Sequence, residues 1–254
     1  MDYKTLNSKA WDEEVRRNNF WTRIAGQEEI EKARSGKPEI RLSPSSYVPR
    51  EWLEDARGKK TLLLAAGGGQ QTPIMSAFGS IVTTVDLSKG QLMQDRKALD
   101  RYGLSASLIE ASMDNLPLSD ESFDYVMNPI SLCFIEDIKA VYREVHRVLR
   151  KGGIFMFGIA NPVLYIFDEK KQEKKLKVKY TLPFSDIASK SRKELERMER
   201  ERDTFEYSHT LSDIIGSLLK TGFIIEGFYS DGADSEPTDS YIFDSYLVFR
   251  ARKI

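Results

Sequence analysis

Short hydrophobic runs and longer amphipathic segments alternate along residues 61–160. The runs TLLLAA, IVTTVD, SASLIEA, FDYVMNP and IFMFGIA are largely apolar at consecutive positions rather than at every second position. Between them, residues 72–79, 88–103 and 135–153 carry apolar side chains at helical spacing. Strands that are apolar on both faces are typical of a parallel sheet covered by helices on both sides. The region therefore predicts a doubly wound α/β fold.

The rest of the chain has other patterns. Residues 5–34 are mostly helical in pattern, and we expect residues 1–50 to form a helical N-terminal prefix to a domain at 51–254. Residues 161–209 are dense in charged and aromatic residues, which predicts a lid insertion over the sheet. A final helix at 211–222 is expected to precede two strands, FIIEGFY and SYIFDSYLVFRAR, that end the sheet as a hairpin.

The composition is that of an ordinary soluble protein. Of 254 residues, 41% are hydrophobic and 30% charged, and 38 Lys and Arg residues balance 39 Asp and Glu residues. This balance argues against a nucleic-acid or membrane-surface partner. The single cysteine, Cys133, excludes an internal disulfide and a multi-cysteine metal site, and we predict no metal. Because no signal peptide or membrane-length apolar run is visible, we expect a cytoplasmic protein.

A glycine loop follows the first hydrophobic run. In AAGGGQQTP, Gly67, Gly68 and Gly69 lie between the predicted strand and a helix expected to begin near Pro73. Ligands of open α/β sheets bind at the carboxyl ends of the strands, and glycine lets backbone approach a ligand closely. The loop lacks the Lys-Ser/Thr ending or third glycine of phosphate loops. A turn that serves only tight packing is the alternative interpretation.

Acidic residues follow the next two strands. Asp86 ends the second run, 19 positions after Gly67, close to the spacing of about 20 at which an acid accepts hydrogen bonds from ribose hydroxyls. Met113 and Asp114 follow the third run, where a carboxylate can accept from an adenine amino group and a thioether can pack on the ring. Asp86 could instead cap the next helix and Asp114 could be a turn residue. Their common register favours a nucleoside-containing ligand.

Residues 60–160 resemble the class I S-adenosylmethionine-dependent methyltransferases of small-molecule type. The resemblance rests on the order of these motifs and on two further stretches, LPLSDESFDYV and YREVHRVLRKGGIFMFG. The resemblance implies a Rossmann-like seven-stranded sheet, mostly parallel with an antiparallel last strand, and S-adenosylmethionine as cofactor. It also implies that the cofactor contacts Ala66, Gly67, Gly68, Gly69, Gln70, Asp86, Leu87, Met113, Asp114 and Asn128.

The loop departs from the family pattern at two positions. Ala65 stands where the family usually has an acid, and Gln71 stands where it has a third glycine. The missing acid would be an electrostatic partner for the cofactor's amino group. We expect the amide oxygens of Gln70 and Gln71 to replace it as hydrogen-bond acceptors, so that GGGQQ is a variant loop.

The acceptor half of the site is predicted from residues farther along the chain. Ser131 and Cys133 follow the fourth strand, and Tyr165 and Tyr207 belong to the aromatic insertion, so all four are candidate substrate contacts. His209 precedes the last helix and is the candidate catalytic base. The alternatives are that Cys133 is a small buried apolar residue, that His209 is a packing residue and that the aromatic residues form the insertion's own core.

The predicted function is that of an enzyme that transfers a methyl group from S-adenosylmethionine to an O or N atom, or else a C atom, of a small organic acceptor. A methyltransferase of nucleic acid or protein is one alternative, suggested by NPIS and the basic stretch KKQEKKLKVK. A non-catalytic cofactor-binding or assembly protein is another, and a nicotinamide dehydrogenase is a minor one. The expected partner is a small-molecule acceptor, nucleic acid is not expected, and a homodimer is left open.

Overall fold

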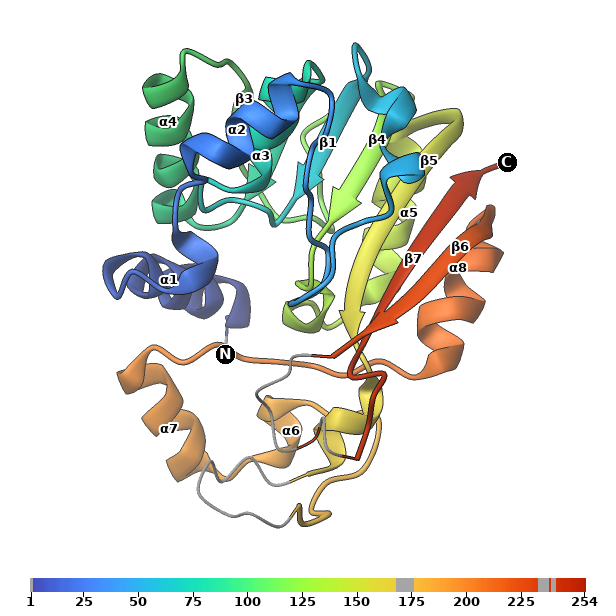
Figure 1. The fold of residues 1–254 in the computed structure, drawn as a ribbon. Helices are drawn as coiled ribbons and strands as arrows, with labels where there is room; N and C mark the ends of the chain where they lie inside the picture. The colour runs from blue at the N-terminus through green and yellow to red at the C-terminus, as the bar shows by residue number, and fades with distance from the viewer. Residues whose placement is uncertain (1, 168–175, 233–237, 239–240) are drawn as a thin grey trace.

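A seven-stranded sheet forms the centre of the molecule (Figure 1). The computed structural model describes residues 2–167, 176–232, 238 and 241–254. The strands of this sheet are β1 Lys60–Leu64, β2 Ile81–Asp86, β3 Ser107–Glu110, β4 Phe123–Asn128, β5 Leu149–Ala160, β6 Phe223–Asp231 and β7 Tyr246–Lys253. Their order is β3-β2-β1-β4-β5-β7-β6. Strands β1 to β5 are parallel, and β7 lies antiparallel between β5 and β6. The predicted Rossmann-like sheet with an antiparallel last strand is confirmed.

Helices cover both faces of the sheet. The α-helices among the described residues are α1 Tyr3–Arg16, α2 Gln27–Arg34, α3 Gln71–Phe78, α4 Lys89–Tyr102, α5 Ile138–Val148, α6 Asp186–Ser189, α7 Arg192–Glu201 and α8 Ser217–Lys220. Leu62 and Leu64 pack on the face that α5 and α8 cover, whereas Leu63 packs on the opposite face with α2 and α3. Consecutive residues of β1 are therefore buried on both sides, as the hydrophobic runs predicted.

Several short turns complete the fold. The helical pattern predicted at 5–34 is interrupted by a 3-10 turn at Phe20–Thr22, where the side chain of Asn19 caps the turn by accepting from the backbone N of Trp21. Further 3-10 turns are Arg50–Trp52, Glu54–Ala56, Leu132–Phe134 and Pro162–Ile166. The predicted final helix is a π-helical turn, Ser212–Gly216, followed by α8. Part of the basic stretch at 170–179 lies outside the described residues.

The segments outside the sheet gather at its carboxyl edge. Figure 1 shows α1 and the insertion, with α6 and α7, at the end toward which β1, β4 and β5 point. In the described part of the chain, no helix has both the length and the apolar character needed to cross a membrane. The same residues contain no group of three or more His, Cys, Asp or Glu side chains placed to hold a metal ion.

Candidate active site

A cavity of about 340 Å³ lies at the carboxyl ends of the parallel strands. Its walls come from the strand ends, the glycine loop, the N-terminal prefix and a small part of the insertion. A cavity of this size is within the range of small-molecule sites. It also lies where open α/β sheets bind their ligands.

The glycine loop packs tightly against helix α4 and the prefix. Ala66, Gly67 and Gln70 line the cavity, whereas Gly68 and Gly69 are not among its lining residues. A Cβ atom on Gly67 would lie 2.6 Å from the Cβ of Gln91 on α4. Gly68 has a φ of +114°, and a Cβ there would lie 2.6 Å from the carbonyl oxygen of a prefix residue. The glycines thus let helix α4 and the prefix approach the loop, which supports the packing interpretation for Gly68 and Gly69.

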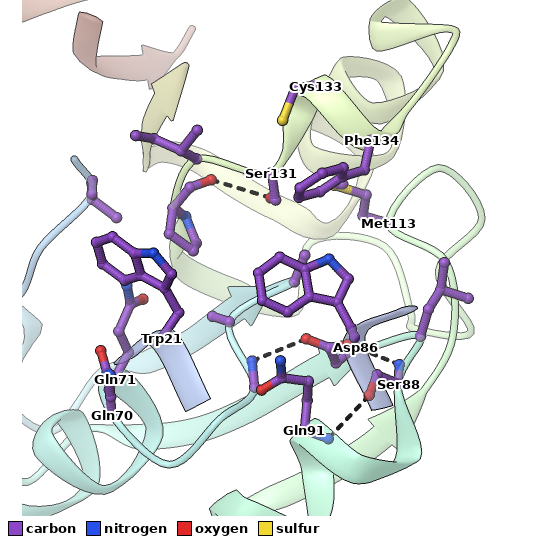
Figure 2. A pocket seen from close by; sticks show the side chains of 18 of the residues that line it. Trp21, Gln70, Gln71, Asp86, Ser88, Gln91, Met113, Ser131, Cys133 and Phe134 are labelled. Carbon is purple, nitrogen blue, oxygen red and sulfur yellow. Dashed lines mark hydrogen bonds between the residues drawn. The ribbon is translucent and has the colours of Figure 1, made fainter. Parts of the chain in front are cut away.

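Asp86 lies at the end of β2 and lines the cavity together with Leu87. Its carboxylate accepts from the backbone N of Gly67 at 3.0 Å and of Ser88 at 2.9 Å (Figure 2). Burial raises the pKa of Asp86 to about 6, against the lowering effect of these two hydrogen bonds. Ser88, not Asp86, caps helix α4, because the Ser88 Oγ accepts from the backbone N of Gln91. The capping alternative for Asp86 is therefore wrong.

Of Met113, predicted for the adenine, and Asn128, predicted for the cavity floor, only Met113 lines the cavity. Met113 is buried and lines the cavity. Asn128 is fully buried behind the lining, and its Nδ2 donates to the carbonyl oxygen of Leu64 at 2.8 Å and to the Oγ of Ser131 at 2.7 Å. Asn128 therefore supports the turn after β4, and its contact with a cofactor stays a prediction.

Asp114 is not among the lining residues. Its carboxylate accepts from the Nζ of Lys4 at 2.6 Å and also from the hydroxyl of Ser112. Burial raises the pKa of Asp114, but the hydrogen bonds from Lys4 and Ser112 outweigh it and leave the pKa below its usual value. Asp114 thus ties helix α1 to the loop after β3, and the predicted contact with adenine stays a prediction.

Three of the four predicted substrate residues line the cavity: Ser131, Cys133 and Tyr165. Cys133 is buried, and burial raises the pKa of its thiol well above the usual value, as expected of a small packing residue. Tyr207 is not among the lining residues. Its ring packs edge-on against Tyr3, with centroids 5.1 Å apart, and its backbone N donates to the carbonyl oxygen of Cys133.

His209, the predicted base, is buried and is not among the lining residues. Its Nε2 lies 3.0 Å from the carbonyl oxygen of Leu132 and therefore donates to it. Burial lowers the pKa of His209, and the hydrogen bond at Leu132 acts in the opposite direction. This arrangement is that of a packing residue, and a catalytic role for His209 has no support from its placement.

The N-terminal prefix contributes more of the cavity wall than its sequence indicated. Trp11 and Trp21 line the cavity, and Figure 2 shows Trp21 beside the two glutamines of the loop. The Oγ of Ser8 donates to the carbonyl oxygen of Leu87 at 2.8 Å, and Asp12 accepts from the hydroxyl of Ser88 at 2.6 Å. These bonds hold helix α1 over the end of β2.

The insertion contributes less than predicted. Of the expected lid at 161–209, Tyr165 and Glu206 line the cavity. Glu206 was missed because a single acid within a charge-dense segment has no local signature. The tryptophans of the prefix were visible in the sequence, but their pattern suited a helix core equally well.

Comparisons with known proteins place the chain in a family. The methyltransferase domain model matches residues 62–157. The uncharacterized methyltransferase YbaJ of Bacillus subtilis is 40% identical over 225 residues, which are 88% of each chain. The chain belongs to the methyltransferases. A demethylmenaquinone methyltransferase of Staphylococcus epidermidis is 31% identical to this methyltransferase over 175 residues, 66% of this chain and 68% of that protein.

A solved structure extends the comparison to the fold. The crystal structure of an S-adenosylmethionine-dependent methyltransferase from Mesorhizobium loti matches this methyltransferase with a TM-score of 0.61. The two sequences are 21% identical, and the match covers 80% of this chain and 95% of the other. The class I fold expected from the sequence is confirmed.

Proposed function

We propose that this methyltransferase transfers the methyl group of S-adenosylmethionine to a small organic acceptor. The observation that carries the proposal is Asp86, a carboxylate at the end of β2 that lines the cavity beside Gly67. An acid held there by backbone N–H groups has further lone pairs for the two ribose hydroxyls of a nucleoside. The protein from Mesorhizobium loti, described as S-adenosylmethionine dependent, has this fold.

The cavity also fits the rest of the cofactor. The Oε1 atoms of Gln71 and Gln91 are buried, and neither has a hydrogen-bond partner within the described residues. Both residues line the cavity, and a rotation of either side-chain amide would turn this acceptor toward a ligand's ammonium or hydroxyl groups. This supports the variant-loop hypothesis for Gln71 more than for Gln70, whose Nε2 donates to the carbonyl oxygen of Phe20 at 2.7 Å. Met113 offers a thioether for the adenine ring.

When bound, S-adenosylmethionine supplies a methyl group that is electrophilic because it is attached to a sulfonium. The protein's task in such an in-line displacement is to orient the acceptor, exclude water and remove a proton where the acceptor has one. Trp11 and Trp21 line the cavity from the prefix, as apolar surfaces that exclude water from it. No covalent protein intermediate is needed.

A small acceptor with an apolar body suits the remaining wall. Leu42, Pro44, Pro129, Ile130 and Phe134 give this part of the cavity an apolar surface. The demethylmenaquinone methyltransferase of Staphylococcus epidermidis is one relative whose name states its acceptor, and that name supports a molecule of this kind. The near-neutral charge disfavours nucleic acid. Cytoplasmic location and a homodimer stay predictions.

The first test is ligand-dependent thermal stability. S-adenosylhomocysteine should stabilise the protein by RT ln(1 + [L]/Kd), about 2.7 kcal/mol at a hundredfold excess over Kd, whereas NAD and ATP should do much less. Transfer of tritium from methyl-labelled S-adenosylmethionine to a panel of phenols, quinols, amines and carboxylic acids then identifies the acceptor class. No stabilisation by S-adenosylmethionine or S-adenosylhomocysteine at millimolar concentration would refute the proposal.

A further inference from the structure

A carboxylate and a phenol meet in the cavity from opposite ends of the insertion. Tyr165 lies in the 3-10 turn after β5, and its hydroxyl donates to the Oε2 of Glu206 at 2.8 Å. Both residues line the cavity, as does the neighbouring Cys133, which is within hydrogen-bonding reach of Tyr165. The pair is 41 residues apart in the sequence, so it exists only in the folded protein.

The backbone of Glu206 is held in place by a buried acid. Its N–H donates to the Oδ2 of Asp186 at 2.8 Å, and the N–H of Asp186 donates back to the carbonyl oxygen of Glu206 at 3.0 Å. Asp186 is buried and forms an ion pair with Lys190 at 2.6 Å. These two reciprocal hydrogen bonds fix the position of the Glu206 backbone relative to α6.

The neighbours of Glu206 are held as firmly. The side chain of Asn7 on α1 accepts from the N–H of Phe205 at 2.7 Å and donates to its carbonyl oxygen at 2.9 Å. On the other side, the N–H of Tyr207 donates to the carbonyl oxygen of Cys133 at 2.7 Å. The three residues around the carboxylate are thus fixed by α1, by α6 and by the turn after β4. A group so positioned needs little reorganisation before it reacts.

The pair lies in the half of the cavity that the cofactor leaves to the acceptor. The proposed cofactor contacts that line the cavity follow β1, β2 and β3, whereas Ser131 and Cys133 follow β4 and Tyr165 follows β5. In the proposed reaction the methyl group passes from the side of β1 to β3 toward the side of β4 and β5. Glu206 lines the wall on that acceptor side, among residues that follow β4 and β5.

The other acids that line the cavity belong to the proposed cofactor half or to the prefix. Asp86 accepts from two backbone N–H groups of the proposed cofactor half. Glu29 accepts from the backbone N of Gly26 at 2.7 Å, and Glu39 pairs with Lys32 at 3.1 Å. Both belong to the prefix, and both bonds hold α2 in place. Among the described lining residues, Glu206 is the carboxylate on the acceptor side.

We propose, on the basis of the proposed function, that Glu206 is the general base of the methyl transfer and that Tyr165 positions its carboxylate. The proton of the acceptor's O–H or N–H group passes to a carboxylate oxygen of Glu206. The electron pair left on the acceptor atom forms the new bond to the methyl carbon, and the electron pair of the broken S–C bond stays on sulfur. The products are the methylated acceptor, S-adenosylhomocysteine and a protonated Glu206.

Tyr165 remains a donor throughout. Burial raises the pKa of its hydroxyl well above the usual value, so the phenol keeps its proton and continues to orient Glu206. Titratable groups near this carboxylate include Tyr165 and Cys133, with Asp186 on the backbone side. Because Tyr165 and Cys133 are both neutral over the working range, and saturating S-adenosylmethionine removes the effect of Asp86 on its binding, an acidic limb in kcat reports the base.

Glu206→Gln is the main test, with the acceptor that the wild type methylates on the panel. The amide can still accept from Tyr165 but cannot take a proton, so kcat should fall about 100-fold or more while the Kd of S-adenosylhomocysteine stays within about twofold. The acidic limb of the kcat–pH profile should disappear. In Glu206→Ala, added formate should restore part of the rate. Glu199→Gln, an exposed acid on α7, is the matched control and should behave as the wild type.

Tyr165→Phe should lower kcat less than Glu206→Gln and leave the acidic limb in place, shifted in pH. A Glu206→Gln variant with the wild-type kcat and limb would overturn the inference and leave the proposed function intact. Loss of rate in Glu206→Ala without formate rescue, with the limb kept in Glu206→Gln, would also overturn it, because the role would then be structural. A wild type that binds S-adenosylhomocysteine but methylates nothing on the panel would refute the base and the proposed acceptor class together.

Discussion

The affinity for S-adenosylhomocysteine should depend on pH through Asp86. This carboxyl has its pKa raised to about 6 by burial, and it must be ionised to accept hydrogen bonds from both ribose hydroxyls. With that pKa, the Asp86 carboxyl is ionised in about nine tenths of the molecules at pH 7 and in about one tenth at pH 5. The affinity should therefore fall about tenfold between these values, which corresponds to about 1.4 kcal/mol.

Isothermal titration calorimetry between pH 5 and 8 measures this dependence. The wild type should bind with constant affinity above about pH 7 and progressively more weakly below about pH 6, in line with the raised pKa of Asp86. Asp86→Asn should bind more weakly throughout and should lack the dependence, because its amide does not titrate. A wild-type affinity that is constant down to pH 5, or an equal slope in Asp86→Asn, would refute the assignment of Asp86 to the ribose.

The raised pKa of Asp86 also predicts how the free energy of unfolding depends on pH. The sign is opposite to that of an acid whose pKa is lowered by folding. Because the folded-state pKa of Asp86 lies above its ordinary value of 3.8, the native protein holds a proton that the unfolded chain releases between about pH 4 and 6. The stabilising contribution is complete below about pH 4 and is lost as the pH rises through about 6. Between about pH 4 and pH 7 the free energy of unfolding of the ligand-free wild type should therefore fall relative to that of Asp86→Asn, by at most about 3 kcal/mol, in urea denaturation.

Two further substitutions test the cavity walls. Gly68→Val should abolish binding of S-adenosylhomocysteine in calorimetry, because a Cβ there would lie 2.6 Å from the Trp21 carbonyl oxygen at a φ that branched residues avoid. Gly152→Asn, also at a positive φ but with open space around it, should bind as the wild type does. Asn7→Leu should lower the free energy of unfolding by about 1–3 kcal/mol, because the backbone N–H and carbonyl of Phe205 lose buried partners. An unchanged melting temperature would contradict this role of Asn7.

The sequence by itself determined the sheet and the edge at which the cavity lies. Consecutive apolar residues such as Leu62 to Leu64 can be satisfied only by burial on both faces, so the five parallel strands were visible as runs. The glycine loop and Asp86 were also predictable, because a residue at the end of a parallel strand lies at the ligand edge whatever the rest of the chain does. Each of these features depends on residues that are close in the sequence or on the connection from one strand to the next.

The tertiary structure alone decided what closes the cavity. Asn7 and Phe205 are 198 residues apart, and Tyr165 and Glu206 are 41 apart, so their contacts leave no periodic pattern in the sequence. The sequence therefore placed the lid in the insertion and the base at His209. In the folded chain, helix α1 covers the end of β2, and the carbonyl oxygen of Leu132 accepts a hydrogen bond from the imidazole of His209. Which of several polar residues faces a cavity depends on the path of the whole chain, because burial and hydrogen bonding are settled only when distant segments meet.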